Sequence, residues 1–96
     1  MYLKIHRSGR YCVVAVCDED ILGKTLKEGN LTVEISEQFY KGKIASENEV
    51  IEALSMATTA NIFGDESVAC AIKCNAVDPD SVIRIEGVPH AQIFRI

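Results

Sequence analysis

The feature that most constrains this chain is a Val-rich run near its N-terminus. Residues 11–17 follow an alternating apolar and polar segment, residues 2–6, across a short polar stretch that contains Ser8-Gly9. This pattern is typical of a β-hairpin, so we expect a hairpin that turns at Ser8-Gly9. Its longest apolar run, residues 12–17, is far shorter than the roughly 20 residues that a membrane span requires. The sequence therefore predicts a sheet, with no segment that crosses a bilayer.

The composition predicts one globular domain over residues 1–96. Of the 96 residues, 48% are apolar and 25% are charged, and only two are proline, which excludes disordered and collagen-like chains. Residues 2–5 are strand-like from the start, and no basic and apolar leader with a cleavage site precedes them, so we expect a cytoplasmic protein. In that compartment the four cysteines are expected to be reduced.

The middle of the chain carries signals for two helices. Ser46 and Glu49 form the Ser-x-x-Glu pattern of a capping box, which predicts a helix that starts there and ends near residues 60–61. Asp65 is suited to cap a second helix over residues 66–74, which Asn75 would end in a left-handed conformation. One helical turn is expected after Asp18, within residues 18–24.

Further strands are predicted at residues 31–35, 82–85 and 92–96, where apolar and polar residues alternate. With the hairpin and the helices they give the order β-β-(α)-β-α-α-β-β. This order predicts an α+β fold, a single domain with a mostly antiparallel or mixed β-sheet of about five strands and two to three helices packed on it.

Charge is spread unevenly along the chain, whose net charge is −4. Residues 1–48 carry seven basic and seven acidic side chains, whereas residues 49–96 carry three basic and seven acidic ones. This balance argues against a general nucleic-acid coat protein, but it is compatible with a local basic face. Basic side chains gather in three places in the first half: Lys4, His6, Arg7 and Arg10; Lys24 and Lys27; Lys41 and Lys43.

The string Gly87-Val88-Pro89-His90-Ala91-Gln92 combines residue types that an ordinary strand end does not need. Gly87 permits positive φ and Pro89 fixes its own φ, so the predicted turn presents the titratable imidazole of His90 close to the amide of Gln92. His90 could bond a backbone carbonyl and lock the turn, or it could contact a ligand near neutral pH. Gln92, two residues on in a strand, would point the same way as His90.

Two further strings offer polar or aromatic groups outside the predicted helices and strands. In Phe39-Tyr40-Lys41-Gly42 the aromatic side chains could anchor the string in the core and leave Lys41 solvated. Alternatively, they could form an aromatic platform beside the Lys41 cation, a pairing that holds unstacked bases. Asn61, expected between the two helices, either shapes a tight corner or presents its amide to a ligand. We expect these motif residues to lie in loops, where recognition commonly sits.

Taken in order and spacing, four strings resemble the archaeal family known as domain of unknown function 424 (DUF424), over nearly the whole chain. They are residues 17–24 (CDEDILGK), 39–42 (FYKG), 60–64 (ANIFG) and 87–92 (GVPHAQ). The resemblance implies an archaeal cytoplasmic protein whose genes often lie near translation and ribosome-maturation genes. Asp20-Ile21 stands where the family pattern has Glu-Leu, and Cys70 and Cys74 are not part of that pattern.

The cysteines do not predict a metal site. Cys12 and Cys17 are five positions apart, so on one strand their side chains point to opposite faces, whereas Cys70 and Cys74 share a helix face. The spacing Cys-x4-Cys is not that of a short zinc knuckle. We expect structural thiols and no metal or other cofactor.

A catalytic alternative uses Cys17 as nucleophile, His90 as base and Asp18 to orient it. Neighbouring acids raise the pKa of a thiol, however, and no oxyanion cradle is evident. The favoured prediction is a non-enzymatic binding module that contacts RNA or a ribonucleoprotein, with recognition by Tyr40, Lys41, Asn61, His90 and Gln92. A third hypothesis is a protein-interaction subunit whose acidic C-terminal half binds a basic partner.

Overall fold

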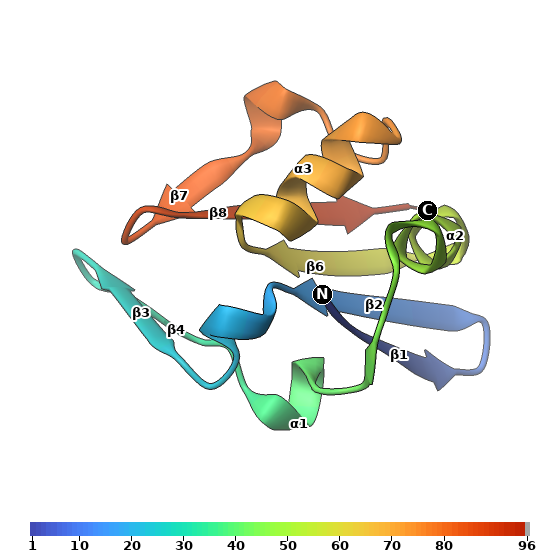
Figure 1. The fold of residues 1–96 in the computed structure, drawn as a ribbon, viewed down its shortest axis with the longest axis horizontal. Coiled ribbons are helices and arrows are strands. Elements are labelled where there is room, and N and C mark those ends of the chain that lie inside the picture. The colour runs from blue at the N-terminus through green and yellow to red at the C-terminus, as the bar shows by residue number, and fades with distance from the viewer. Residues whose placement is uncertain (96) are drawn as a thin grey trace.

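Six strands form one mixed sheet in the computed structural model, which describes residues 1–95 (Figure 1). The spatial order is β5-β1-β2-β6-β8-β7, and all neighbours are antiparallel except the parallel pair β2 and β6. The strands are β1 (Tyr2–Ser8), β2 (Tyr11–Cys17), β5 (Lys43–Ile44), β6 (Thr59–Phe63), β7 (Ile83–Ile85) and β8 (Val88–Phe94). The predicted hairpin and the predicted α+β class are confirmed, with one strand more in this sheet than the five expected.

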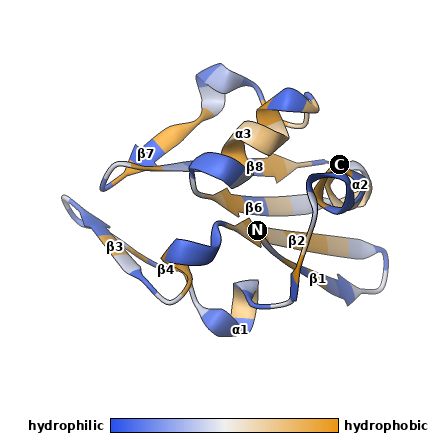
Figure 2. Ribbon diagram, viewed as in Figure 1, coloured by the Kyte–Doolittle hydropathy of each residue, from blue (hydrophilic) through white to orange (hydrophobic). Residues whose placement is uncertain are grey.

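Two helices cover one face of this sheet. They are α2 (Glu47–Met56) and α3 (Asp65–Lys73), whose buried side chains include Val50, Leu54 and Val68. These side chains pack on the inward residues of the central strands, such as Val14 and Ile62, to form the larger hydrophobic core. Figure 2 shows the same division by hydropathy, with hydrophobic colours concentrated in β2, β6 and β8 and hydrophilic colours at helix ends and turns.

Smaller elements cover only part of the opposite face. They are the 3-10 turn η1 (Glu19–Ile21), the separate hairpin of β3 (Thr25–Glu28) and β4 (Leu31–Glu34), and the short helix α1 (Glu37–Tyr40). Ile21, Leu26, Ile35 and Tyr40 pack there against Phe63 and form a second core. The strand predicted at residues 31–35 is present, but it pairs with β3 and not with the main sheet.

The first long helix begins as predicted and ends earlier than predicted. Ser46 and Glu49 form the capping box, but α2 ends at Met56, so the expected end near residues 60–61 is wrong. Ala57 has extended backbone angles, and the Thr58 N–H donates to the Cys12 carbonyl at 2.8 Å. This bond draws the chain alongside β2, and residues 59–63 form a central strand instead of a helix end.

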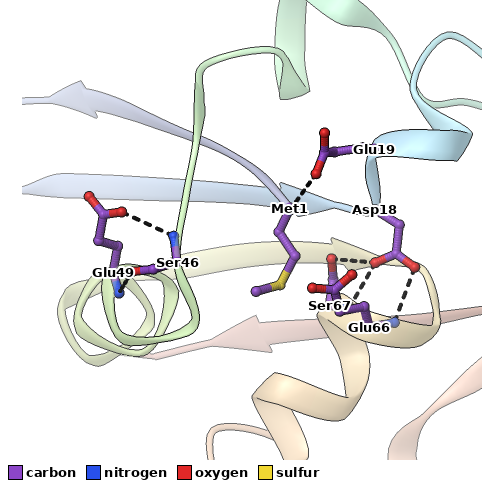
Figure 3. A network of polar contacts seen from close by, with 7 residues as sticks. All are labelled: Met1, Asp18, Glu19, Ser46, Glu49, Glu66 and Ser67. Atoms are coloured by element: carbon purple, nitrogen blue, oxygen red, sulfur yellow. Dashed lines mark hydrogen bonds and ion pairs between the residues drawn. The ribbon is translucent and has the colours of Figure 1, made fainter.

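The second helix is capped from a distant part of the chain. Asp65 lies in its first turn and is not the cap, contrary to expectation, because the cap position belongs to Gly64. The Asp18 carboxylate instead accepts hydrogen bonds from the N–H of Glu66 at 3.1 Å, the N–H of Ser67 at 2.8 Å and the Ser67 hydroxyl at 2.7 Å (Figure 3). A Cβ atom on Gly64 would lie 2.3 Å from the Asp18 carboxyl carbon, so this approach requires glycine.

The two C-terminal strands lie on either side of Gly87 as expected, but β8 begins at Val88, four residues before the predicted start at Gln92, and ends at Phe94. The predicted strand over residues 92–96 includes residue 96, which lies outside the described residues. Asn75 adopts a φ of 61° after α3, as predicted. Among residues 1–95, no helix is long and apolar enough to cross a membrane.

Candidate functional site

Four of the five residues predicted to carry recognition lie at one pocket on the partly covered face of the sheet. Tyr40 comes from α1, Asn61 from β6, and His90 and Gln92 from β8. The pocket has a volume of about 370 Å³, and we call it the strand pocket. Its lining residues are Val33, Glu34, Ser36, Phe39, Tyr40, Asn61, Phe63, His90 and Gln92.

Strand register explains why residues so far apart in the sequence meet here. Phe63 pairs with His90, and Asn61 pairs with Gln92, across the antiparallel ladder of β6 and β8. Directly paired residues point to the same face of a sheet, and residues two apart on a strand do the same. The expected common direction of His90 and Gln92 is therefore confirmed by the register. The expectation that the motif residues lie in loops is wrong for Asn61 and His90, because β6 and β8 extend through them, whereas Gln92 lies in a strand as predicted.

His90 has one defined hydrogen bond and one free ring nitrogen. Its Nδ1–H donates to the carbonyl of Ile62 at 3.0 Å, since a carbonyl oxygen can only accept. The neutral ring then has an acceptor lone pair on Nε2. No side-chain nitrogen or oxygen within residues 1–95 is both buried and unpartnered, so Nε2 is not completely buried, and His90 is one of the residues that line the pocket. Burial lowers the pKa of His90 and favours this neutral form, although the bond to Ile62 acts in the opposite direction.

Asn61 and Gln92 present a pair of amides beside His90. The Gln92 Nε2 donates to the Asn61 Oδ1 at 3.1 Å. This bond leaves the carboxamide oxygen of Gln92 and the NH₂ group of Asn61 for a ligand. Glu34 on β4 lines the same pocket, and its carboxylate can act as another acceptor. The strand pocket thus combines hydrogen-bond acceptors with amide donors.

Aromatic rings form its apolar side. Phe63 stacks on His90 with centroids 3.9 Å apart, and Tyr40 meets Phe63 edge to face at 6.0 Å. The series continues from Tyr40 to Phe39 at 5.0 Å and from Phe39 to His6 at 4.7 Å. Tyr40 is almost fully buried, and burial raises the pKa of its phenol further above the usual range. Among the rings that line the pocket, those of Tyr40, Phe63 and His90 are buried and that of Phe39 is half-buried, so Phe39 offers the most ring surface to a planar ligand.

Lys41 is the one predicted recognition residue that does not line the strand pocket. Its Nζ lies 3.3 Å from a Glu37 carboxylate oxygen, one turn away on α1, and its side chain is exposed. Lys43 likewise pairs with Glu49. The basic cluster of Lys41 and Lys43 is therefore locally balanced by acids, and the expected platform of Tyr40 with Lys41 does not form.

Cys17, Asp18 and His90 do not form a catalytic set. Cys17 and His90 lie on the same face, but Phe63 on β6 stands between them in the register, which separates their strands by about 10 Å. Burial, and then the charge of Asp18, raise the pKa of the Cys17 thiol to about 12. Asp18 is engaged at the start of α3 and not with His90. The geometry therefore does not support the enzyme alternative.

The remaining cysteines are free thiols. Cys12 and Cys70 are buried and Cys74 is half-buried. Cys70 and Cys74 lie at the end of α3, as their spacing predicts, with their sulfur atoms near the carbonyls of Glu47 and Ala71. In the described part of the chain, no cluster of three or more His, Cys, Asp or Glu residues is arranged to hold a metal ion.

Sequence reasoning did not select several pocket residues. Phe63 lies in the string at residues 60–64, but only Asn61 of that string was predicted to carry recognition. Glu34 and Ser36 had no local signal at all, because their place depends on how the hairpin of β3 and β4 folds over the sheet. The helix α1 was also missed, although Ser36 caps it by accepting from the Phe39 N–H at 3.2 Å.

Comparisons with known proteins place the chain among proteins of unknown function. A family model described as "Protein of unknown function (DUF424)" matches residues 6–96. A crystal structure of an uncharacterized conserved protein from Methanopyrus kandleri superposes with a TM-score of 0.81 at 32% sequence identity. The match covers 96% of this chain and 88% of that one. A search of curated proteins gave no match.

Proposed function

The chain belongs to DUF424, a family of proteins of unknown function, and from its strand pocket we propose that it is a non-enzymatic module that binds RNA or a ribonucleoprotein. The observation that carries the proposal is the meeting of Tyr40, Asn61, His90 and Gln92, from three separate segments, at one pocket. Aromatic surface combined with hydrogen-bonding groups is the way proteins hold unstacked bases of RNA.

The groups in the strand pocket favour a base that carries an exocyclic amine. The Nε2 of His90 and the carboxylate of Glu34 are acceptors, and cytosine and adenine present amino hydrogens at the edge where uracil presents an oxygen. The amide groups of Asn61 and Gln92 can complete recognition with a donor and an acceptor. We therefore expect cytidine or adenosine to bind better than uridine.

Binding fits the protonation states better than catalysis does. The Cys17 thiol stays protonated near neutral pH because burial raises its pKa, so it is a poor nucleophile. We also propose that the protein acts in the archaeal cytoplasm, in association with translation or ribosome maturation. That part rests on the family resemblance and not on the pocket.

The proposal is tested by calorimetric titration with cytidine and uridine 5′-monophosphate. Gln92→Ala removes an exposed amide at the pocket and should lower cytidine affinity about fivefold, the effect of one lost hydrogen bond. Lys41→Ala is the matched control, because Lys41 is exposed but lies outside the strand pocket, and it should leave the affinity unchanged. If the wild type binds neither nucleotide, or if both variants lose affinity equally, the proposal is wrong.

The two other hypotheses predict different results. Thiol-dependent turnover that Cys17→Ser abolishes would support the enzyme. Co-purification of one basic protein after nuclease treatment would support an interaction subunit. Under this last hypothesis the basic partner would bind acidic residues of the C-terminal half, which come from several elements, including Glu52 on α2, Glu66 on α3 and Glu86 before β8.

A further inference from the structure

The part of the sheet face beside the strand pocket carries exposed aromatic side chains. Phe94 is 74% exposed and Tyr11 is 63% exposed, and they are the only aromatics among the large hydrophobic side chains exposed in residues 1–95. Phe94 pairs with Thr59, one step along the ladder from the pair of Asn61 and Gln92. Phe94 therefore stands on the pocket's face, about 7 Å along β8 from Gln92.

Tyr11 lies on the same face, on the far side of β6 from β8. Val13 pairs with Thr59 in the parallel ladder of β2 and β6, and Tyr11 is two residues before Val13 on β2. The helix α1 and the hairpin of β3 and β4 cover the other end of this face, around Tyr40 and Phe63. Phe94 and Tyr11 thus occupy the part of the face that these elements leave open.

The strands of the main sheet differ from the rest of the molecule in that they lack acidic residues. The chain has 14 Asp and Glu residues, yet none lies within the bounds of the six strands of the main sheet. Lys4 and His6 lie on β1 at the side of this face, where they bond to the carbonyls of Gln38 and Phe39 in α1, and the exposed Arg10 precedes Tyr11 in the turn. Glu34 on β4 is the acidic residue at the pocket, whereas the strands of the main sheet carry none, so a polyanion is suited to pass over the open strands of this protein of net charge −4.

The surroundings of the two aromatics also favour bases over a protein partner. Thr59, Asn61 and Gln92 lie around Phe94, whereas Tyr11 pairs with Ser8 and has Val13 next to it on the same face, so polar residues separate the two rings. Continuous apolar area is the mark of a protein interface, whereas isolated rings on a sheet are used to stack successive bases.

We propose that Phe94 and Tyr11 stack two further bases of the strand whose first base occupies the strand pocket, so that the natural ligand is single-stranded RNA of at least three nucleotides and not a free nucleotide. This inference rests on the proposed function. Each exposed ring would hold one further base, with the phosphates passing over the acid-free strands. Recognition of base identity would remain in the pocket, because the two exposed rings accept any base.

The test compares cytidine 5′-monophosphate with a cytidine trinucleotide in titrations of the same variants. The trinucleotide should bind the wild type more tightly than the monophosphate. Phe94→Ala should lower trinucleotide affinity at least about fivefold, the smallest effect expected when one stacked base is lost, and leave monophosphate affinity unchanged. Phe94→Tyr should retain trinucleotide affinity. Met56→Ala removes an exposed side chain from α2 and should change neither affinity.

The possible outcomes distinguish failure of this inference from failure of the proposed function. If the monophosphate binds but the trinucleotide binds no better, or if Phe94→Ala leaves trinucleotide affinity unchanged, the stacking surface is wrong and the pocket proposal stands. If neither ligand binds the wild type, both are wrong. If sedimentation instead shows that wild-type chains associate and that Phe94→Ala separates them, the face is a protein interface and the RNA path is overturned.

Discussion

The imidazole of His90 stacks on the ring of Phe63, with ring centroids 3.9 Å apart and planes 15° apart. Phe63 belongs to the smaller core, and both residues line the strand pocket. The imidazole of His90 therefore contacts both the core, through Phe63, and the pocket of the candidate ligand. A change in the protonation of His90 should consequently affect both stability and binding.

The first prediction concerns pH. The folded protein holds the pKa of His90 below its ordinary value of about 6.5, so the unfolded chain takes up the proton first as pH falls. The stabilising contribution of His90 is complete above pH 6.5 and is lost as pH falls through the folded-state pKa. Urea unfolding at pH 7.5 and pH 5.5 should show a larger loss of unfolding free energy for the wild type than for His90→Gln. Equal losses would contradict this account.

Nucleotide binding should follow the same titration. Protonation of Nε2 converts the acceptor in the strand pocket into a donor, which cannot pair with an amino group of a base. We therefore expect cytidine 5′-monophosphate affinity to fall between pH 7 and pH 5. Calorimetry in matched buffers measures this change. An affinity that rises as pH falls would show that the protonated imidazole binds the phosphate instead.

Asp18 should matter for stability through the start of α3. It accepts three hydrogen bonds, from the N–H groups of Glu66 and Ser67 and from the Ser67 hydroxyl. Asp18→Ala should lower the unfolding free energy by about 1–2 kcal/mol, as the loss of a helix cap does. Asp20→Ala, an exposed neighbour in η1, is the control and should cost less than about 0.5 kcal/mol. Equal unfolding midpoints for the two variants would show that the remote cap contributes nothing.

Gly42 should not tolerate a side chain. A Cβ atom there would lie 2.1 Å from the Leu3 carbonyl oxygen, so β5 and β1 would have to separate. Gly42→Ala should destabilise by about 3 kcal/mol, at the upper end for overpacking. Gly9→Ala adds a methyl group in open space at a φ of 58° and should cost only about 1 kcal/mol. Thermal unfolding of both variants checks the order, and the reverse order would mean that Gly42 does not press on β1.

The thiols should differ in reactivity. Cys17 is fully buried and its pKa is raised to about 12, so iodoacetamide should label it far more slowly than a free thiol. Cys74 is the most exposed of the four cysteines and should be labelled first. Mass spectrometry of peptides after timed labelling measures both rates. If Cys17 were labelled first in the folded protein, the buried thiol described here would be wrong.

Local signals in the sequence were sufficient for much of the fold. The pair Ser46 and Glu49 located the start of α2, and Asn75 located the end of α3, because each acts within one turn of backbone. Residues 59–63 were missed because Ala57, Thr58 and Ala60 fit a continuing helix and no glycine or proline interrupts it. What ends the helix is the bond from Thr58 to Cys12, a contact between segments 46 residues apart.

The candidate site was harder to predict for the same reason. His90 and Gln92 share a direction through strand alternation alone, which the sequence reveals. Asn61 joins them only because β6 pairs with β8, and Tyr40 only because α1 folds over the sheet. Lys41, adjacent to Tyr40 in sequence, lies outside the pocket because it pairs with Glu37 on its own helix.

The most direct test of the account is an NMR titration of the ¹⁵N-labelled wild type with a cytidine trinucleotide. We expect the largest shifts at the backbone amides of His90 and Phe94 and at the side-chain amides of Asn61 and Gln92. Residues on the exposed side of α2, such as Glu52, should stay unchanged. If the shifts are confined to α2 and α3, or if none exceeds the effect of added buffer, the sheet face is not the RNA-binding surface.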